Sequence, residues 1–181
     1  TEQTRVLSYE IIVIDNASAD ETPQRLQAWV DLDPAHRKIV LNSDNRGFGP
    51  AVNQGLALAQ GEYLVILNND IIVGPGWLRG LRRHLEVNPE LGLLCPVTNN
   101  IGNEAQVALQ GSTPAEVFES ARHYNLGRAG KLLPLTIAAF FCVMMPRRVY
   151  SAVGGLDEQF VPGFFEDDDY CLRVKALGMA I

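Results

Sequence analysis

The stretch YEIIVIDNASADET, residues 9–22, runs from apolar residues into a polar turn. Residues 9–15 are rich in isoleucine and valine without polar alternation, which predicts a β-strand buried on both faces. Ser18 followed by Glu21 fits a capping box, so we expect a helix that runs to about Val30. A strand that leads directly into a helix is the first half of a βαβ unit.

The same alternation of strand and helix continues through the first half of the chain. The sequence predicts strands at 38–42 and 62–68, a helix that contains Pro50 and closes at Gly61, and a helix at 77–87. Strands separated by helices at this short spacing are typical of a parallel sheet with helical crossovers. The fold class is therefore α/β, with a mostly parallel sheet flanked by helices.

In the second half of the chain, strands and helices alternate less regularly. It is expected to hold strands at 91–96, 105–109 and 135–145, and helices at 114–123, 146–153 and up to Gly178.

The chain is long enough for one domain, and 47% hydrophobic and 20% charged residues are ordinary for a soluble globular protein. The net charge of −6 gives no electrostatic reason to expect nucleic acid as a partner. The three cysteines are far apart, which favours a reducing compartment over a disulfide framework.

Polar residues follow three of the predicted strands: Asp15 with Asn16, residues 43–47, and residues 68–70. In open parallel sheets, ligands bind beyond the carboxyl ends of the strands, so we expect these three stretches to converge. Asp70 at a strand tip suits Mg²⁺ or Mn²⁺, which take few protein carboxylates and complete their shell with phosphate and water. Each stretch also has a simpler explanation, a polar turn or helix cap with no ligand.

Four carboxylates stand in a row at residues 166–169, directly after Gly163-Phe164-Phe165. Such residues in the first turn of a helix complement its macrodipole, which is the simple explanation of the cluster. Crowding beside apolar residues also raises carboxyl pKa values, and a raised pKa suits a general base near neutral pH. On a helix Glu166 and Asp169 share one side and Asp167 points elsewhere, so the carboxylates are expected to have different roles.

Four motifs in order, EIIVIDNASADET, NRGFGPAVNQGLALAQGEYLVILNND, VGGLDEQF and FFEDDDYCLRVKALG, resemble the family 2 glycosyltransferases. These are inverting enzymes of the GT-A fold that use a nucleotide-sugar donor, and the variants here look most like the rhamnosyltransferase-type branch. The resemblance implies one glycosyltransferase domain over residues 1–181, with a nucleotide-sugar half (1–90) and an acceptor and catalytic half (91–181). It also implies that the family's first strand is absent and that residues 1–10 are the tail of its first helix.

The resemblance assigns roles to individual residues. Asp167 matches the family's general base, with Glu166 and Asp169 beside it, and Asp70 matches the principal metal ligand. Gly155 and Asp157 fall on the segment that frames the acceptor. Residues of the donor site are expected at Asp15, Asn16, Asn45, Arg46, Gly47, Asn53, Asn68 and Asn69.

The implied activity is inverting transfer of a hexosyl or rhamnosyl group in bacterial cell-surface polysaccharide synthesis. The donor would be a UDP- or dTDP-sugar, the acceptor a saccharide or lipid-linked saccharide, and the cofactor Mg²⁺ or Mn²⁺. A cytoplasmic location, at the inner face of the plasma membrane or free, and a homodimer through exposed strand edges are further expectations. Two alternatives stay open: a sugar nucleotidyltransferase, and a non-catalytic module that binds nucleotide sugars.

Overall fold

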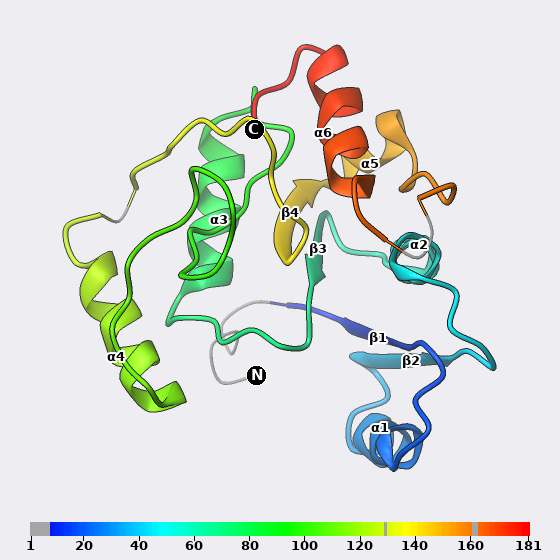
Figure 1. Ribbon diagram of the computed structural model, residues 1–181. Coiled ribbons are helices and arrows are strands. Elements are labelled where there is room, and N and C mark those ends of the chain that lie inside the picture. Colours follow the sequence, from blue (N-terminus) through cyan, green and yellow to red (C-terminus); the bar gives the residue numbers. More distant parts are fainter. Residues whose placement is uncertain (1–7, 129, 161–162) are drawn as a thin grey trace.

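The computed structural model describes residues 8–128, 130–160 and 163–181 (Figure 1). Strands and helices alternate in the first half, and helices dominate the second. The elements are β1 (Ile11–Asp15), α1 (Thr22–Asp31), β2 (Arg37–Leu41), α2 (Phe48–Leu58), β3 (Tyr63–Leu67), α3 (Trp77–Val87), α4 (Pro114–Asn125), β4 (Cys142–Pro146), α5 (Arg147–Val153) and α6 (Glu166–Ala176).

The first two strands form a parallel pair with a helix on each side. β1 pairs with β2 in a register that sets Val13 opposite Ile39, and α1 and α2 lie on opposite sides of the pair (Figure 1). The predicted βαβ unit is therefore present. The prediction that residues 9–15 are buried on both faces is wrong, since residues 11–14 are only half-buried. Within the described residues β1 pairs with β2 alone, so its environment is more open than that of a central strand.

The other two strands pair antiparallel, so the sheet is less parallel than expected. β3 and β4 form a separate two-stranded sheet in which Val65 lies opposite Met144. All five residues of β4 are buried, and the side chains of its first four residues alternate between two clusters. Cys142 and Met144 pack with Leu81 and Leu85 of α3. The intervening β4 residues pack on the opposite side, with apolar side chains of α5 and α6: Val143, Met145, Val149, Tyr170, Val174.

Three strands predicted in the second half differ from the observed backbone. The strand expected at 135–145 is confined to Cys142–Pro146. Before it, backbone groups are taken by side chains instead of a ladder: the Ala138 N–H donates to Cys171 Sγ (3.3 Å), and the Ile137 carbonyl accepts from Asn103 (3.1 Å). The segments 91–96 and 105–109 make only isolated bridges, such as Leu94 to Met144.

The helices agree with the sequence better than the strands do. α3 has the predicted bounds, and α4 begins at the predicted Pro114 and ends two residues beyond the expected position, at Asn125. The capping box predicted at Ser18 and Glu21 is wrong, because the Ser18 side chain bonds to Asp15 and α1 has no side-chain cap. A complete capping box stands instead at α4, between Thr113 and Glu116.

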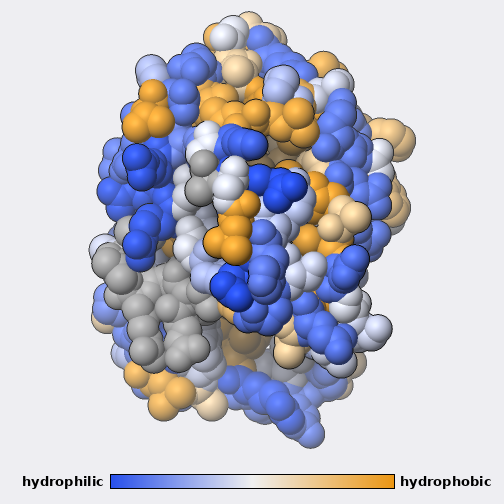
Figure 2. Space-filling model, turned by 90° about the vertical axis from the view of Figure 1, so that its left-hand side faces the viewer, coloured by the Kyte–Doolittle hydropathy of each residue, from blue (hydrophilic) through white to orange (hydrophobic). Residues whose placement is uncertain are grey.

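Residues 1–7 of the expected first-helix tail lie outside the described residues, and residues 8–10 form neither helix nor strand. In the part of the chain that is described, no helix combines the length and apolar character needed to span a bilayer. Figure 2 shows hydrophobic residues on the α3–α4 side as separate patches among hydrophilic ones. No large apolar belt is visible on that face.

Candidate functional site

The polar ends of β1 and β2 form one hydrogen-bond network. The Asn16 amide nitrogen donates to Asn45 Oδ1 (2.8 Å) and to the Gly47 carbonyl (3.1 Å). Its oxygen accepts from Asn42 Nδ2 and from the Arg46 N–H, both at 3.1 Å. The first two of the three predicted polar stretches therefore converge, and Asn16 ties the loop before α2 to the end of β1.

Asp15 closes the turn that follows β1. The residue is only 5% exposed, and its carboxylate accepts from the Ser18 N–H (3.2 Å) and from the Ser18 hydroxyl. Behind the network, Asn42 and Gln54 exchange two hydrogen bonds of 2.9 Å, which join the end of β2 to α2. These contacts hold the polar loop in place against the parallel pair.

Asn68, Asn69 and Asp70 form a turn directly after β3. The Asn68 N–H donates to the Phe141 carbonyl (2.8 Å), and the next two residues are exposed. Among the described residues no hydrogen bond joins this turn to the Asn16 network. The turn offers amide and carboxylate oxygens to solvent, a donor set that suits a hard divalent cation completed by phosphate and water. Among the residues that the structure describes, no three His, Cys, Asp or Glu side chains cluster as a ready metal site.

Asn53 of α2 contacts the segment expected on the acceptor side. Its amide nitrogen donates to the Leu156 carbonyl and to Glu158 Oε1, both at 2.9 Å, and its oxygen accepts from the Leu156 N–H (2.8 Å). A Cβ at Gly155 would lie only 2.5 Å from Asn53 Oδ1, so the close approach requires glycine there. Since these bonds occupy the Asn53 side chain, its role here is to join the two halves of the chain.

α6 holds the same turn from the other side. Arg173 pairs with Asp169 (2.8 Å) and donates to the carbonyls of Val153 (3.1 Å) and Gly155 (3.0 Å). Tyr170 donates its hydroxyl to the Gly154 carbonyl (3.1 Å), and burial raises the pKa of its phenol to about 12, so the phenol stays protonated. The turn at 153–156 is therefore fixed between α2 and α6.

The four carboxylates at the start of α6 lie in different surroundings. Glu166 is 8% exposed, and no described group bonds its buried Oε2. Asp167 is half-buried and accepts from the Asp168 N–H (3.0 Å). Burial, and secondly the charge of Asp167, raises the pKa of Asp168 above its ordinary value, as expected for crowded carboxylates. Asp169 is held by Arg173.

The chain enters α6 through two strained residues. Phe164 and Phe165 have φ angles of 82° and 71°, in the left-handed region that bulky side chains seldom adopt. Such residues cost on the order of 1–3 kcal/mol each and concentrate at functional sites. Phe165 is the N-cap of α6 and makes no side-chain cap hydrogen bond.

Sequence reasoning missed the residues that hold the site together. Asn42, Gln54 and Arg173 were not singled out, although Arg173 stands four residues after Asp169, at helical pairing distance. The contact of Asn53 with Leu156 spans 103 positions, and nothing local in the sequence indicates it.

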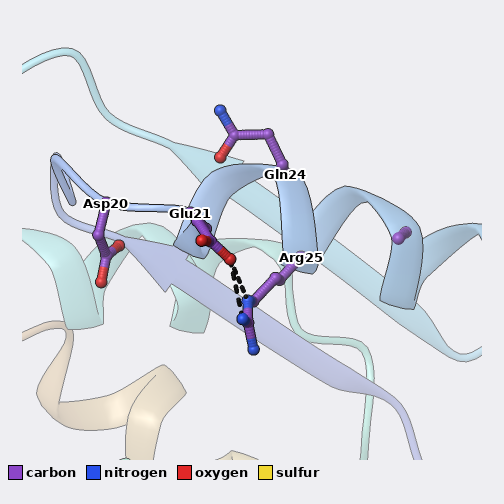
Figure 3. A pocket seen from close by; sticks show the side chains of 5 residues that line it. Asp20, Glu21, Gln24 and Arg25 are labelled. Atoms are coloured by element: carbon purple, nitrogen blue, oxygen red, sulfur yellow. Dashed lines mark hydrogen bonds and ion pairs between the residues drawn. The ribbon is translucent and has the colours of Figure 1, made fainter.

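A shallow surface hollow lies elsewhere, at the start of α1. It is lined by Asp20, Glu21, Gln24, Arg25 and Ala28, and Glu21 pairs with Arg25 across one helical turn at 2.8 Å (Figure 3). The four side chains labelled there are polar, and none was predicted to act in catalysis or in binding. The hollow carries no functional assignment.

Comparison with known proteins identifies the family. The model of the glycosyl transferase family 2 matches residues 2–154. The chain belongs to this family. The matched part includes the Asn16 network and the turn after β3, and it ends before α6.

Two relatives take part in polysaccharide synthesis according to their names. The O-antigen biosynthesis protein RfbC of Myxococcus xanthus is 32% identical over 99% of this chain and 14% of its own length. The succinoglycan biosynthesis protein ExoO of Rhizobium meliloti is 33% identical over 74% of this chain and 34% of its own length. The chain thus spans about a third or less of these two relatives.

Solved structures confirm the GT-A fold for this family 2 chain. GalNAc-T7, crystallised with UDP, GalNAc and Mn²⁺, superposes with a TM-score of 0.70 at 18% identity, over 94% of this chain and 35% of that one. The mannosyltransferase PcManGT of Pyrobaculum calidifontis, in complex with GDP-Man and Mn²⁺, gives 0.65 at 20% identity, over 94% of this chain and 44% of that one. The α/β fold class and the family predicted from the motifs are both confirmed.

Proposed function

We propose that this chain is the donor-binding and catalytic core of an inverting glycosyltransferase in bacterial cell-surface polysaccharide synthesis. The observation that carries the proposal is the contact between Asn53 and Leu156, because it seats the donor-side helix α2 against the segment that leads to the carboxylates of α6. Family membership and the names of RfbC and ExoO support sugar transfer as the reaction.

The donor is proposed to be a UDP- or dTDP-sugar held beyond the ends of the strands. Asn16, Asn45, Arg46 and Gly47 form one polar surface there, with Asp15 fixing the turn beneath it. Amide groups and backbone N–H groups at such an edge suit the base, ribose and phosphates of a nucleotide. Asn53 acts in this account by positioning α2, and Asn68 and Asn69 flank the diphosphate.

Asp70 is the proposed protein ligand for Mg²⁺ or Mn²⁺. Asp70 is exposed, and within the described residues its carboxylate takes no part in the Asn16 network, so it can bind a cation that brings phosphate and water ligands with it. The bound cation supplies charge neutralisation for the leaving nucleoside diphosphate. Both structural neighbours contain Mn²⁺, which supports a divalent metal for this fold.

Asp167 is the proposed general base. An acceptor hydroxyl is a poor nucleophile, so its proton must leave as the oxygen attacks the anomeric carbon. Asp167 takes that proton, the new C–O bond forms as the bond to the diphosphate oxygen breaks, and the single displacement inverts the anomeric centre. Glu166 and Asp169 help to position Asp167. Asp169 does so through its ion pair with Arg173, which fixes α6, and Glu166 does so as the buried residue directly before Asp167.

The reaction class is tested by the product that the full-length protein releases. The protein is incubated with UDP-, dTDP- and GDP-sugars and simple saccharide acceptors, with and without Mg²⁺ or Mn²⁺, and donor binding is followed by thermal shift. We expect nucleoside diphosphate release that depends on metal and acceptor. Pyrophosphate release would instead indicate a sugar nucleotidyltransferase, and metal-dependent donor binding without transfer or hydrolysis would indicate a binding module.

A further inference from the structure

The end of α4 and the segment after it concentrate positive charge in an acidic chain. Residues 120–156 contain no aspartate or glutamate, although the whole chain has a net charge of −6. Arg122, Arg128 and Lys131 lie in this stretch, and all three are exposed. Within the described residues Arg122 pairs with Glu119 (2.8 Å), whereas no carboxylate lies at pairing distance from the other two. Such segregation of charge indicates a surface for an anionic partner.

Exposed apolar side chains stand among these charges: Leu126 (63% exposed), Leu132 (44%) and Leu133 (54%). The chain turns tightly here, because the Arg128 N–H donates to the Asn125 carbonyl and the Lys131 N–H donates to the Arg128 carbonyl, both at 3.1 Å. The leucines and the cationic groups are therefore gathered into a short, compact part of the surface.

α4 itself lies at the periphery of the molecule and outside the core. None of its 12 residues is buried. Figure 1 shows α4 and the segment that follows it at one outer edge, away from both sheets. A helix of this length gains little stability on its own in water, and its local support here is the capping box and the pair of Glu119 with Arg122. An edge of this kind can contact a flat partner.

We propose that this basic surface, residues 122–128 and 130–133, docks on an anionic lipid bilayer. Arginine and lysine attract anionic headgroups, and leucines among them enter the boundary between headgroups and acyl chains. A nucleic acid would match the charges and leave the leucines in water. On the α3–α4 side hydrophobic residues form separate patches among hydrophilic ones (Figure 2), as expected for a protein that binds a bilayer surface without spanning it.

The basic surface lies beside the segment that leaves the Asp70 turn. A Cβ at Gly74 would lie 3.7 Å from Asn125 Nδ2, at the end of α4. Gly74 follows Asp70 by four residues, so their Cα atoms are at most about 14 Å apart. Docking would therefore bring lipid-linked acceptors towards the cation site proposed above. This last step rests on the proposed function, whereas the docking itself does not.

Vesicle binding by the full-length protein tests the docking. Flotation with vesicles of phosphatidylglycerol and phosphatidylcholine in equal parts is compared with flotation with phosphatidylcholine alone. Arg128→Gln with Lys131→Gln should lower the partition coefficient on the anionic vesicles at least about tenfold, since each such charge near an anionic surface is worth about a fivefold change. Leu132→Asn with Leu133→Asn should lower it at least about fivefold, because apolar contact with the bilayer is lost.

Two matched controls separate the position of these residues from their chemistry. Arg25→Gln with Arg82→Gln lowers the net charge by the same amount at exposed arginines of α1 and α3, and Leu32→Asn with Leu177→Asn removes exposed leucines elsewhere. Both controls should bind the anionic vesicles within about twofold of the wild type. Sugar transfer to a soluble acceptor should be unchanged in all four variants, and thermal midpoints confirm that they fold.

Three results would overturn the docking: equal binding of the wild type to both kinds of vesicle, unchanged anionic binding in the glutamine variant at 128 and 131, and losses of the same size in the controls. Binding to heparin as tight as to anionic vesicles, with no effect of the leucine substitutions, would assign the charges to a soluble polyanion instead. Because the assay contains no donor or acceptor, a protein that binds vesicles and transfers no sugar would contradict the proposed function alone.

Discussion

At the start of α6, neighbouring carboxylates differ in what surrounds them. Asp169 is held by the Arg173 guanidinium, whereas Asp168 carries a raised pKa because it is partly desolvated and stands beside the charge of Asp167. A carboxyl whose pKa is higher in the folded chain than in the unfolded chain destabilises the fold when it is ionised. This destabilisation is absent below the ordinary pKa of 3.8 and is complete above the folded pKa.

Asp168→Asn is therefore expected to raise the free energy of unfolding at pH 7 and to leave it unchanged near pH 3. Urea unfolding of the variant and the wild type at several pH values measures the free energy of unfolding at pH 7 and near pH 3. Asp20→Asn is a control for which the opposite change in the free energy of unfolding is expected. The hydrogen bond from Thr22 lowers the pKa of the Asp20 carboxyl, so this variant should lose stability at pH 7. An Asp168→Asn variant less stable than wild type at pH 7, or one whose gain persists at pH 3, would contradict the assignment.

At the scale of elements, local signals located the helices and missed the long-range strand pairing. α3 has clear boundaries in the sequence, with Gly76 before it and Asn88-Pro89 after it, and its bounds are as predicted. β4 is shorter than its apolar run, because the residues before it bond to side chains from 34 and 33 positions away. Such partners are not visible in a local pattern.

The same limit applies to the candidate site. The motifs pointed to the polar loop at 45–47 and to the carboxylates of α6. The turn at 153–156 is held between α2 and α6 by Asn53 and Arg173, which bond its backbone groups. Backbone groups carry no residue-specific signal, so a single sequence does not predict these contacts.

The junction of α2 with the turn at 153–156 can be tested with two glycines. A Cβ at Gly155 would lie 2.5 Å from Asn53 Oδ1, so Gly155→Ala should displace Asn53 from Leu156 and cost about 1–3 kcal/mol by leaving backbone groups unpaired. At Gly49 of α2 the nearest atom to an added Cβ is 3.6 Å away, so Gly49→Ala should change stability by less than about 0.5 kcal/mol or increase it. Urea unfolding measures both, and equal effects would contradict the close approach.

At the scale of the whole molecule, the described chain holds two separate two-stranded sheets. β1 pairs with β2 and β3 pairs with β4, and within the described residues the second edge of β3 has no strand beside it. Leu67, at the end of that strand, is 47% exposed. Exposed apolar strand edges promote pairing with another chain, which is the physical basis for the homodimer we expect.

Residues 1–181 alone should therefore self-associate as concentration rises, and Leu67→Lys should weaken that association because a charge on a strand edge opposes pairing. Sedimentation velocity over a range of concentrations measures it, with Leu32→Lys as a control at an exposed leucine outside the sheets. A chain that stays monomeric throughout, or equal effects of the two substitutions, would contradict pairing through β3.

The central claim is that Asp70 and Asp167 divide binding and catalysis within one glycosyltransferase site. The most direct measurement compares Asp167→Asn with Asp70→Asn in the full-length protein, recording both sugar transfer and the metal-dependent thermal shift on donor binding, with Asp168→Asn as the neighbouring control. We predict that Asp167→Asn loses transfer by at least about a thousandfold and keeps the donor-dependent shift, that Asp70→Asn loses the shift, and that Asp168→Asn keeps both. Transfer by Asp167→Asn at a rate close to that of the wild type would contradict the claim.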